Sequence, residues 1–237
     1  MRCSFVFSAV VLSAMSQAAF AVDTVEASRV GYGLTQNINV TGSQIGGSFT
    51  FPVGQFVYNF RNGVGEGALL NGDTLTFCTD LAQDVFPGYA LYNVVPVANT
   101  PDPGPVMGGA KAQAIADVWA AIAGQQFTSA PHAAAFQMLV WEIVYDFTGS
   151  VGSLDASSGN VQYQSSASTA GHFSSTLAIF NSFKSAVGGG GSLSDLRAVT
   201  NGDNQDQIVI IPAPGAIALV GAAAFMAVRR NRPRNAK

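Results

Sequence analysis

Two residues of this chain have side chains whose types and setting could support covalent chemistry. Cys78 lies in the run LTFCTDL, and a cysteine thiolate is a strong nucleophile. Gln137 lies within Ala130–Asp146, APHAAAFQMLVWEIVYD, where nearly every neighbour is apolar. A buried amide without a partner costs about 1–3 kcal/mol, so Gln137 needs one. The sequence offers Cys78 and Gln137 as a candidate reactive pair, because a thiol that is held close to an amide carbonyl can attack it.

Residues 1–22 have the composition of a secretory signal peptide. Arg2 provides a basic start, Phe5–Met15 is an apolar core, and AFA at 19–21 is a small-residue cleavage site. The alternative is a buried N-terminal strand, which the coincidence of all three features disfavours. We therefore expect the chain to be exported.

The C-terminal segment, residues 212–237, combines prolines, an apolar run and a basic end. Every residue from Ala216 to Val228 is apolar or glycine, a run of 13, whereas a helix that crosses a bilayer needs about 20. Pro212 and Pro214 interrupt any extension of this run toward the N-terminus. The basic residues that follow it are Arg229, Arg230, Arg232, Arg234 and Lys237. Such a basic end is typical of a cytoplasm-facing stop, so we expect a short or partial membrane span.

This tail resembles the bacterial PEP-CTERM sorting signal, which joins a proline-containing motif, an apolar helix and an arginine cluster. The resemblance covers Ile211–Arg234 and departs from the family at Pro212-Ala213-Pro214, where alanine replaces glutamate. It implies export, followed by cleavage and transfer to the cell envelope or extracellular matrix by an exosortase-type enzyme. The alternative is a plain C-terminal membrane anchor.

The remaining part, residues 23–211, should form one domain with a single core, or two small cores. It contains 5 basic residues and all 14 acidic residues of the chain, a net charge of −9. A body with this charge repels anionic surfaces, and we expect no nucleic-acid partner.

The cysteine count limits the chemistry further. Cys3 lies in the signal peptide, so Cys78 is the single cysteine of the body, in an oxidising compartment. No disulfide can form within the body, and an odd cysteine in an exported protein indicates pairing between chains or a reactive thiol. There is no CxxC, no HExxH and no cluster of histidines with carboxylates. These absences exclude a structural zinc site, and we expect no metal and no cofactor.

The first part of the body has the alternating pattern of β-strands. Residues 25–60 contain SFTFPV and QFVYNF, and residues 74–79 alternate again. A period of two places Leu75 and Phe77 on one face of this second segment and Cys78 on the other.

The period changes to that of helices after a Pro- and Gly-rich loop at 98–109. The remaining predicted elements are a strand over 89–97, helices over 111–123, 132–146 and 173–187, an exposed Ser- and Gly-rich loop over 148–171, and closing strands over 193–199 and 207–211. The helix over 132–146 should be buried on most sides, because apolar residues surround it. The sequence thus predicts an α+β domain with a β-sandwich or barrel-like core and a helical insertion.

Short motifs around the reactive pair are similar to those of the thioester domains of bacterial surface adhesins. Phe77-Cys78 is an aromatic-Cys motif, and residues 136–141, FQMLVW, are an apolar-Gln-x-x-apolar-Trp motif. In that family the cysteine sulfur displaces ammonia from the glutamine and leaves an internal thioester. Carried over to this chain, Cys78 is the thiol and Gln137 is the acyl donor.

The resemblance covers residues 75–146 and implies further roles. Phe77, Phe136 and Trp141 should pack around the pair. An incoming lysine amine would attack the Gln137 carbonyl, free the thiol and leave an isopeptide bond. This is single-turnover adhesion rather than enzymatic catalysis, and it needs no cofactor or metal. The family is best known in wall-anchored Gram-positive proteins, whereas the tail of this chain is of another type.

Three other interpretations stay open. Cys78 and Gln137 can be core residues of a non-reactive structural or matrix protein. Cys78 can be the nucleophile of a cysteine hydrolase with His132 or His172 as base, although no oxyanion motif accompanies it. The run Asn201–Asp206 can bind calcium, but it lacks the glycine and the distal glutamate of a calcium loop and better fits a solvated turn.

Overall fold

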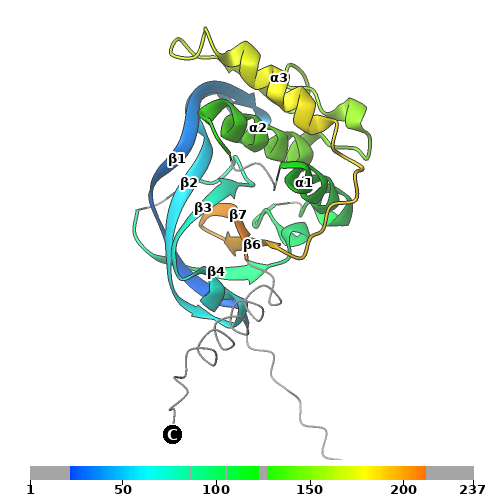
Figure 1. Ribbon diagram of the computed structural model, residues 1–237. Helices are drawn as coiled ribbons and strands as arrows, with labels where there is room; N and C mark the ends of the chain where they lie inside the picture. The colour runs from blue at the N-terminus through cyan, green and yellow to red at the C-terminus, as the bar shows by residue number, and fades with distance from the viewer. Residues whose placement is uncertain (1–21, 86, 105, 123–126, 212–237) are drawn as a thin grey trace, which may run out of the picture.

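The structure is a computed structural model, and most of the body is described by it (Figure 1). The described residues are 22–85, 87–104, 106–122 and 127–211. The predicted signal peptide, apart from its last residue, and the predicted sorting signal with Pro212, Pro214, Arg229 and Arg230 lie outside them. Within these ranges no helix has the length and apolar character to cross a membrane.

The β part consists of antiparallel strands whose pairing closes on itself. The strands are β1 (Thr24–Gly42), β2 (Gly47–Val64), β3 (Gly72–Cys78), β4 (Ala90–Val95), β5 (Val161–Ser165), β6 (Leu196–Asn201) and β7 (Asn204–Ile210). Their order is β2-β3-β7-β6-β4-β1-β5, and β1 also pairs with β2. Six strands therefore form a closed ring, and β5 is added to the far half of β1.

The β1–β2 hairpin is much longer than the other strands and extends beyond the ring. Its pairing runs from Thr24 opposite Val64 to Gly42 opposite Gly47, with register shifts along the way. One shift lies next to Gly54, which has a φ of 142°. A Cβ atom there would lie 2.3 Å from the carbonyl oxygen of Leu34, so only glycine fits this bulge. The hairpin can thus curve along α2 (Figure 1).

Three α-helices lie together against the strands (Figure 1). They are α1 (Gly108–Ile122), α2 (Ala130–Asp146) and α3 (Phe173–Lys184). Short 3₁₀ turns are η1 (Ser43–Ile45), η2 (Gly65–Leu70), η3 (Val97–Asn99) and η4 (Val151–Ser153). α2 contacts β1, β2, α1 and α3, and every residue from Ala133 to Val144 is buried. The α+β class and the burial of this helix are both confirmed.

The predicted strand that carries Cys78 is confirmed as β3, but the exposure of its residues does not alternate. Leu75 is 45% exposed, whereas Thr76, Phe77 and Cys78 are all buried. Alternating exposure requires one face of a strand to meet solvent, and the end of β3 passes beneath α2 instead. One face of β3 is therefore exposed to solvent at Leu75, whereas both faces are covered at Cys78.

The predicted loop over 148–171 contains the strand β5. Val161 and Tyr163 are buried, and β5 pairs with Ile38–Gly42 of β1. The sequence signal was weak because only two apolar residues alternate among serines and glutamines. Pairing with the extended half of β1 supplies the stabilisation that the local sequence lacks.

Candidate functional site

The side chain of Gln137 lies against the backbone of Cys78. Gln137 Oε1 accepts a hydrogen bond from the Cys78 N–H at 2.9 Å, and Gln137 Nε2 donates to the Cys78 carbonyl oxygen at 2.7 Å. Both residues are fully buried. Exchanging the amide oxygen and nitrogen would place donor against donor, so the amide has one favourable orientation. The fold thus joins the two residues that the sequence analysis paired, which are 59 positions apart.

Two elements hold this contact in place. Cys78 is the last residue of β3, and it pairs with Gln207 of β7 while Phe77 pairs with Ile208. Gln137 lies in the middle of α2, and the strands and helices that contact α2 bury this part of the helix completely. A strand end and a buried helix restrict both residues far more than loops would.

The thiol of Cys78 is held in its protonated form. Its Sγ donates a hydrogen bond to the carbonyl oxygen of Asp80 at 2.6 Å. Burial raises the pKa of the Cys78 thiol well above its usual value, and the negative charge of Asp80 raises it further. The indole N–H of Trp141 lowers the pKa of the thiol, but its effect is smaller than that of burial. This N–H makes no hydrogen bond of ordinary geometry among the described residues, and the Cys78 sulfur is a weak acceptor.

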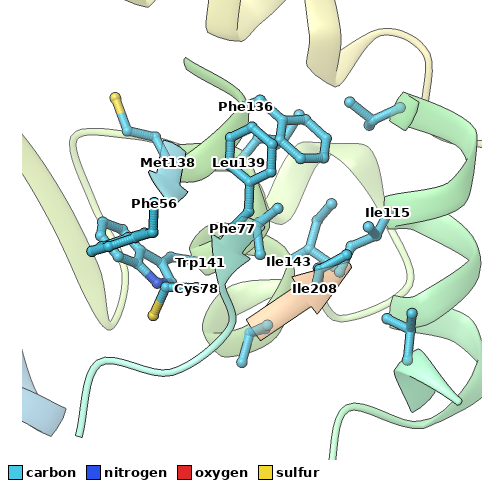
Figure 2. Close-up of a cluster of buried hydrophobic side chains, with 14 of the residues drawn as sticks. Phe56, Phe77, Cys78, Ile115, Phe136, Met138, Leu139, Trp141, Ile143 and Ile208 are labelled. Carbon is cyan, nitrogen blue, oxygen red and sulfur yellow. The ribbon is translucent and has the colours of Figure 1, made fainter. Parts of the chain in front are cut away.

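The aromatic residues of the two motifs lie on the two faces of the end of β3. The rings of Phe77 and Phe136 meet edge to face with centroids 4.7 Å apart. Figure 2 shows Trp141 and Phe56 on the side of Cys78, away from the Phe77–Phe136 pair. The two faces of the β3 end therefore differ, with an aromatic pair on one and the thiol with its indole on the other.

Two acids, Asp80 and Asp206, are buried near the end of β3, and the sequence analysis did not predict the burial of either one. Asp80 Oδ1 accepts hydrogen bonds from the N–H groups of Ala82 and Gln83 at 2.7 and 2.8 Å. Asp206 accepts from Thr100 Oγ1 at 3.0 Å and also from the N–H groups of Asp102 and Asn201. Burial raises the pKa of Asp206 to about 7 and also raises the pKa of Asp80. The polar run directly after the apolar strand was the available signal.

The run Asn201–Asp206 forms the turn of the β6–β7 hairpin rather than a calcium loop. Asn201 Oδ1 accepts hydrogen bonds from the Asp203 N–H and from Asn204 Nδ2. Within the described ranges no group of three or more His, Cys, Asp or Glu residues is placed to hold a metal ion.

Glu142 is a second polar residue of α2 that the sequence analysis did not single out. It is fully buried, its Oε2 accepts a hydrogen bond from the Asp155 N–H at 3.0 Å, and its Oε1 has no partner among the described residues. Burial raises the pKa of Glu142 to about 9, and the charges of Asp146 and Asp155 add to this effect. An acid in the middle of an apolar helix was the available signal.

Neither histidine pairs with the thiol. His132 Nδ1 shares a hydrogen bond with Ser129 Oγ at 2.7 Å, and the His132 ring lies 6.2 Å from that of Phe183. His172 is exposed just before α3. The Cys78 thiol donates its hydrogen bond to the carbonyl oxygen of Asp80 and not to a histidine. The described part of the chain therefore shows no Cys–His pair of the kind that a cysteine hydrolase requires.

Known proteins were also compared with this chain. Neither the protein-family models, nor the curated proteins, nor the solved structures match it. The functional argument that follows therefore rests on the two sequence motifs and on the geometry of the Cys78–Gln137 contact.

Proposed function

We propose that this chain is an exported protein of the cell envelope or extracellular matrix in which Cys78 and Gln137 form an internal thioester. The observation that carries the proposal is the pair of hydrogen bonds between the Gln137 amide and the Cys78 backbone. An amide is a poor acyl donor unless it is held close to its nucleophile, and these bonds hold the amide against the backbone of the residue that carries the thiol. The proposal includes a barrel-like core with a helical insertion, which the closed ring of strands supports.

The proposed reaction is an exchange of ammonia for sulfur. The Cys78 sulfur attacks Cδ of Gln137, the carbon–sulfur bond forms, and the carbon–nitrogen bond breaks. The thiol proton passes to the departing nitrogen, which leaves as ammonia. The Cys78 N–H already points at Gln137 Oε1 and would stabilise the negative charge that develops there. Because burial raises the pKa of the thiol, its proton moves together with the attack rather than before it.

The thioester would then capture an amine from another molecule. Residues 23–211 contain two lysines, and both are engaged elsewhere. Lys111 Nζ donates to the Val144 carbonyl oxygen at 2.6 Å, and Lys184 Nζ donates to that of Leu154 at 2.8 Å. A lysine amine of a surface or matrix partner would attack the acyl carbon, form an isopeptide bond and release the thiol. Because both reacting groups are buried, Trp141 or the segment after β3 must first move, and capture should be slow.

In this proposal, the predicted terminal signals direct the chain out of the cell, where the chemistry would take place. The proposed partners are an exosortase-type processing enzyme and, before processing, the membrane into which the apolar run Ala216–Val228 would insert. The tail would be removed or would remain as an anchor. The net charge of −9 on the body makes a nucleic-acid partner unfavourable. Apart from the partner's amine, the proposed steps use the side chains of this chain, and capture that occurs once would make the chain an adhesion protein rather than an enzyme.

Intact mass spectrometry of the exported protein tests the thioester. We expect a chain lighter by one ammonia, about 17 Da, whose Cys78 resists alkylation even in denaturant until methylamine is added. The matched variants Cys78→Ser and Gln137→Glu should both have full mass. Full mass and a freely alkylated Cys78 in unfolded wild-type protein would rule the thioester out.

A non-reactive structural role is the second candidate. Its support is that both polar atoms of the Gln137 amide are paired with backbone groups and that the thiol is paired with the carbonyl oxygen of Asp80. A satisfied buried amide needs no reaction to explain it. The same mass measurement separates the two candidates, because the structural role predicts an unmodified chain.

A further inference from the structure

A cleft of about 720 Å³ lies beside the Cys78–Gln137 pair and has Trp141 in its wall. Its other walls come from the β1–β2 hairpin, from η1 and from the segment Leu81–Val85, which follows β3. Cavities that bind small ligands have volumes of about 300–1,000 Å³. Neither Cys78 nor Gln137 lines this cleft, so its chemistry can be considered separately from theirs.

Aromatic rings form the hairpin side of the cleft. Tyr32 and Phe56 lie with ring centroids 5.5 Å apart, and Phe49 and Phe51 lie 6.0 Å apart. Tyr32 is 47% exposed and Phe49 is 51% exposed. Exposed rings in a concave site offer flat apolar faces to a ligand, and few other side chains give as much contact area.

Two amide oxygens in the cleft walls lack a donor. The Nε2 of Gln83 donates to the carbonyl oxygens of Asn201 and Gly202 at 3.2 and 2.9 Å, and these bonds fix Gln83 Oε1 as an acceptor. Gln83 Oε1 and Gln44 Oε1 are both buried and have no hydrogen-bond partner among the described residues. A buried acceptor without a donor is costly. Neither oxygen is exposed in this structure, so a small movement of each side chain would bring it to an O–H or N–H group of a ligand in the cleft.

Arg29 supplies the complementary donors. Its guanidinium lies over the ring of Tyr32, 4.7 Å from the centroid, and it forms no hydrogen bond or ion pair among the described residues. Asp84 also lines the cleft and balances the charge of Arg29. The cleft thus combines donors, acceptors and aromatic faces without a net charge.

We infer that this cleft binds a neutral oligosaccharide. Pyranose rings have apolar C–H faces that stack on aromatic side chains, and each hydroxyl group can donate and accept a hydrogen bond. An ammonium ligand would be repelled by Arg29 and would leave its donors unused. An anion would be repelled by Asp84, and a purely apolar ligand would leave the Gln44 and Gln83 oxygens unpaired.

An extended peptide is a poorer fit to the same place. The open edge of β2 next to the cleft runs through Gly47–Gln55, since β3 pairs only with residues 56–60. Pro52 has no N–H to donate to an added strand, and Gly54 lies at the bulge. A peptide could therefore not form a continuous row of backbone hydrogen bonds along this edge.

Fluorescence titration of the mature chain tests the inference, because Trp141 lies in the cleft wall. The probes are cellohexaose, xylohexaose, mannohexaose, maltohexaose and chitohexaose, in a Trp119→Phe background that leaves Trp141 as the reporter. At least one of them should shift the emission saturably. Phe49→Ala and Gln83→Ala should each weaken its binding about tenfold, whereas Tyr89→Ala, an exposed aromatic outside the cleft, should not change it.

The possible outcomes separate this inference from the thioester proposal. Cys78→Ser should abolish the mass deficit and keep oligosaccharide binding, so either proposal can fail alone. If no probe binds at millimolar concentration, or if the Phe49→Ala and Gln83→Ala variants bind as well as wild type, the inference is overturned. Saturation of the Trp141 signal by an extended peptide or by a simple amine, without binding of any sugar, would also overturn it.

Discussion

Two polar side chains of α2, Gln137 and Glu142, are equally buried but differently satisfied. Both are fully buried, and they lie five residues apart on the same helix. The amide of Gln137 uses both of its polar atoms on the Cys78 backbone. The carboxyl group of Glu142 accepts one hydrogen bond from Asp155 and has a second oxygen without a partner among the described residues.

The difference shows that burial alone does not identify a functional polar residue. A neutral amide matches a backbone N–H and C=O pair, so Gln137 stabilises the strand end at little cost. A carboxyl group in the same setting avoids the cost of a buried charge by remaining protonated, and burial accordingly raises the pKa of Glu142 to about 9. Gln137 thus connects two elements, whereas Glu142 makes the stability of the helix region depend on pH.

Removing the Gln137 amide should have the largest effect. In a Cys78→Ser background, which excludes any thioester, Gln137→Leu leaves the N–H and C=O of residue 78 buried and unpaired. We expect a loss of about 3–5 kcal/mol in the free energy of unfolding, measured by urea denaturation. Met138→Leu, a volume-conserving change on the same helix, should cost less than about 1.5 kcal/mol. Equal unfolding midpoints for the two variants would show that the two hydrogen bonds contribute nothing.

Glu142→Gln should remove part of the pH dependence of stability. The pKa of Glu142 rises from 4.5 to about 9 on folding. The unfolded chain therefore releases its proton first, and stability falls as pH rises from about 4.5 to about 9. We expect the variant to match wild type near pH 4 and to be more stable by roughly 2–4 kcal/mol at pH 8 in urea denaturation.

The control for this comparison is the same substitution at Glu66. Arg197 forms a hydrogen-bonded ion pair with Glu66 and lowers the pKa of that carboxyl group. This acid contributes stability above its unfolded pKa, and the contribution is lost as pH falls, so Glu66→Gln should be slightly destabilising at pH 8. A gain in stability at pH 8 for both variants would point to net charge rather than to the burial of Glu142.

Tyr163→Phe should have the smallest effect on α2. The Tyr163 hydroxyl donates to the Met138 carbonyl oxygen at 2.9 Å in a buried position. Losing one neutral hydrogen bond should cost about 1 kcal/mol in the free energy of unfolding. Tyr89→Phe, at an exposed site, should be close to neutral. A loss for Tyr163→Phe as large as that for Gln137→Leu would mean that the Cys78–Gln137 contact is not exceptional.

The sequence predicts features that depend on one element and a short motif. The helix now seen as α2 follows from its apolar surroundings, and the requirement of Gln137 for a partner follows from the same observation. The partner itself was found because a single cysteine stood out in the body. The structure places Gln137 on the backbone of Cys78, which residue spacing could not predict.

Features assembled from distant segments were not predictable in this way. Leu75 is exposed because α2 covers only the end of β3, and β5 exists because β1 extends far enough to pair with it. The cleft combines Arg29, Gln44, Gln83 and Trp141 from four parts of the chain. The periodicity of a sequence predicts single helices and strands, and it does not predict which residues of distant segments come together in one cleft.

The closure of the ring by its last strand has a consequence for the order of folding in the proposed export. β7 (Asn204–Ile210) is the final described element, yet it pairs with both β3 and β6. A chain that crosses a membrane from its N-terminus cannot complete the environment of Cys78 until residue 207 has emerged. The proposed thioester would then form only after translocation, so the chain would cross the membrane unfolded and without a cross-link.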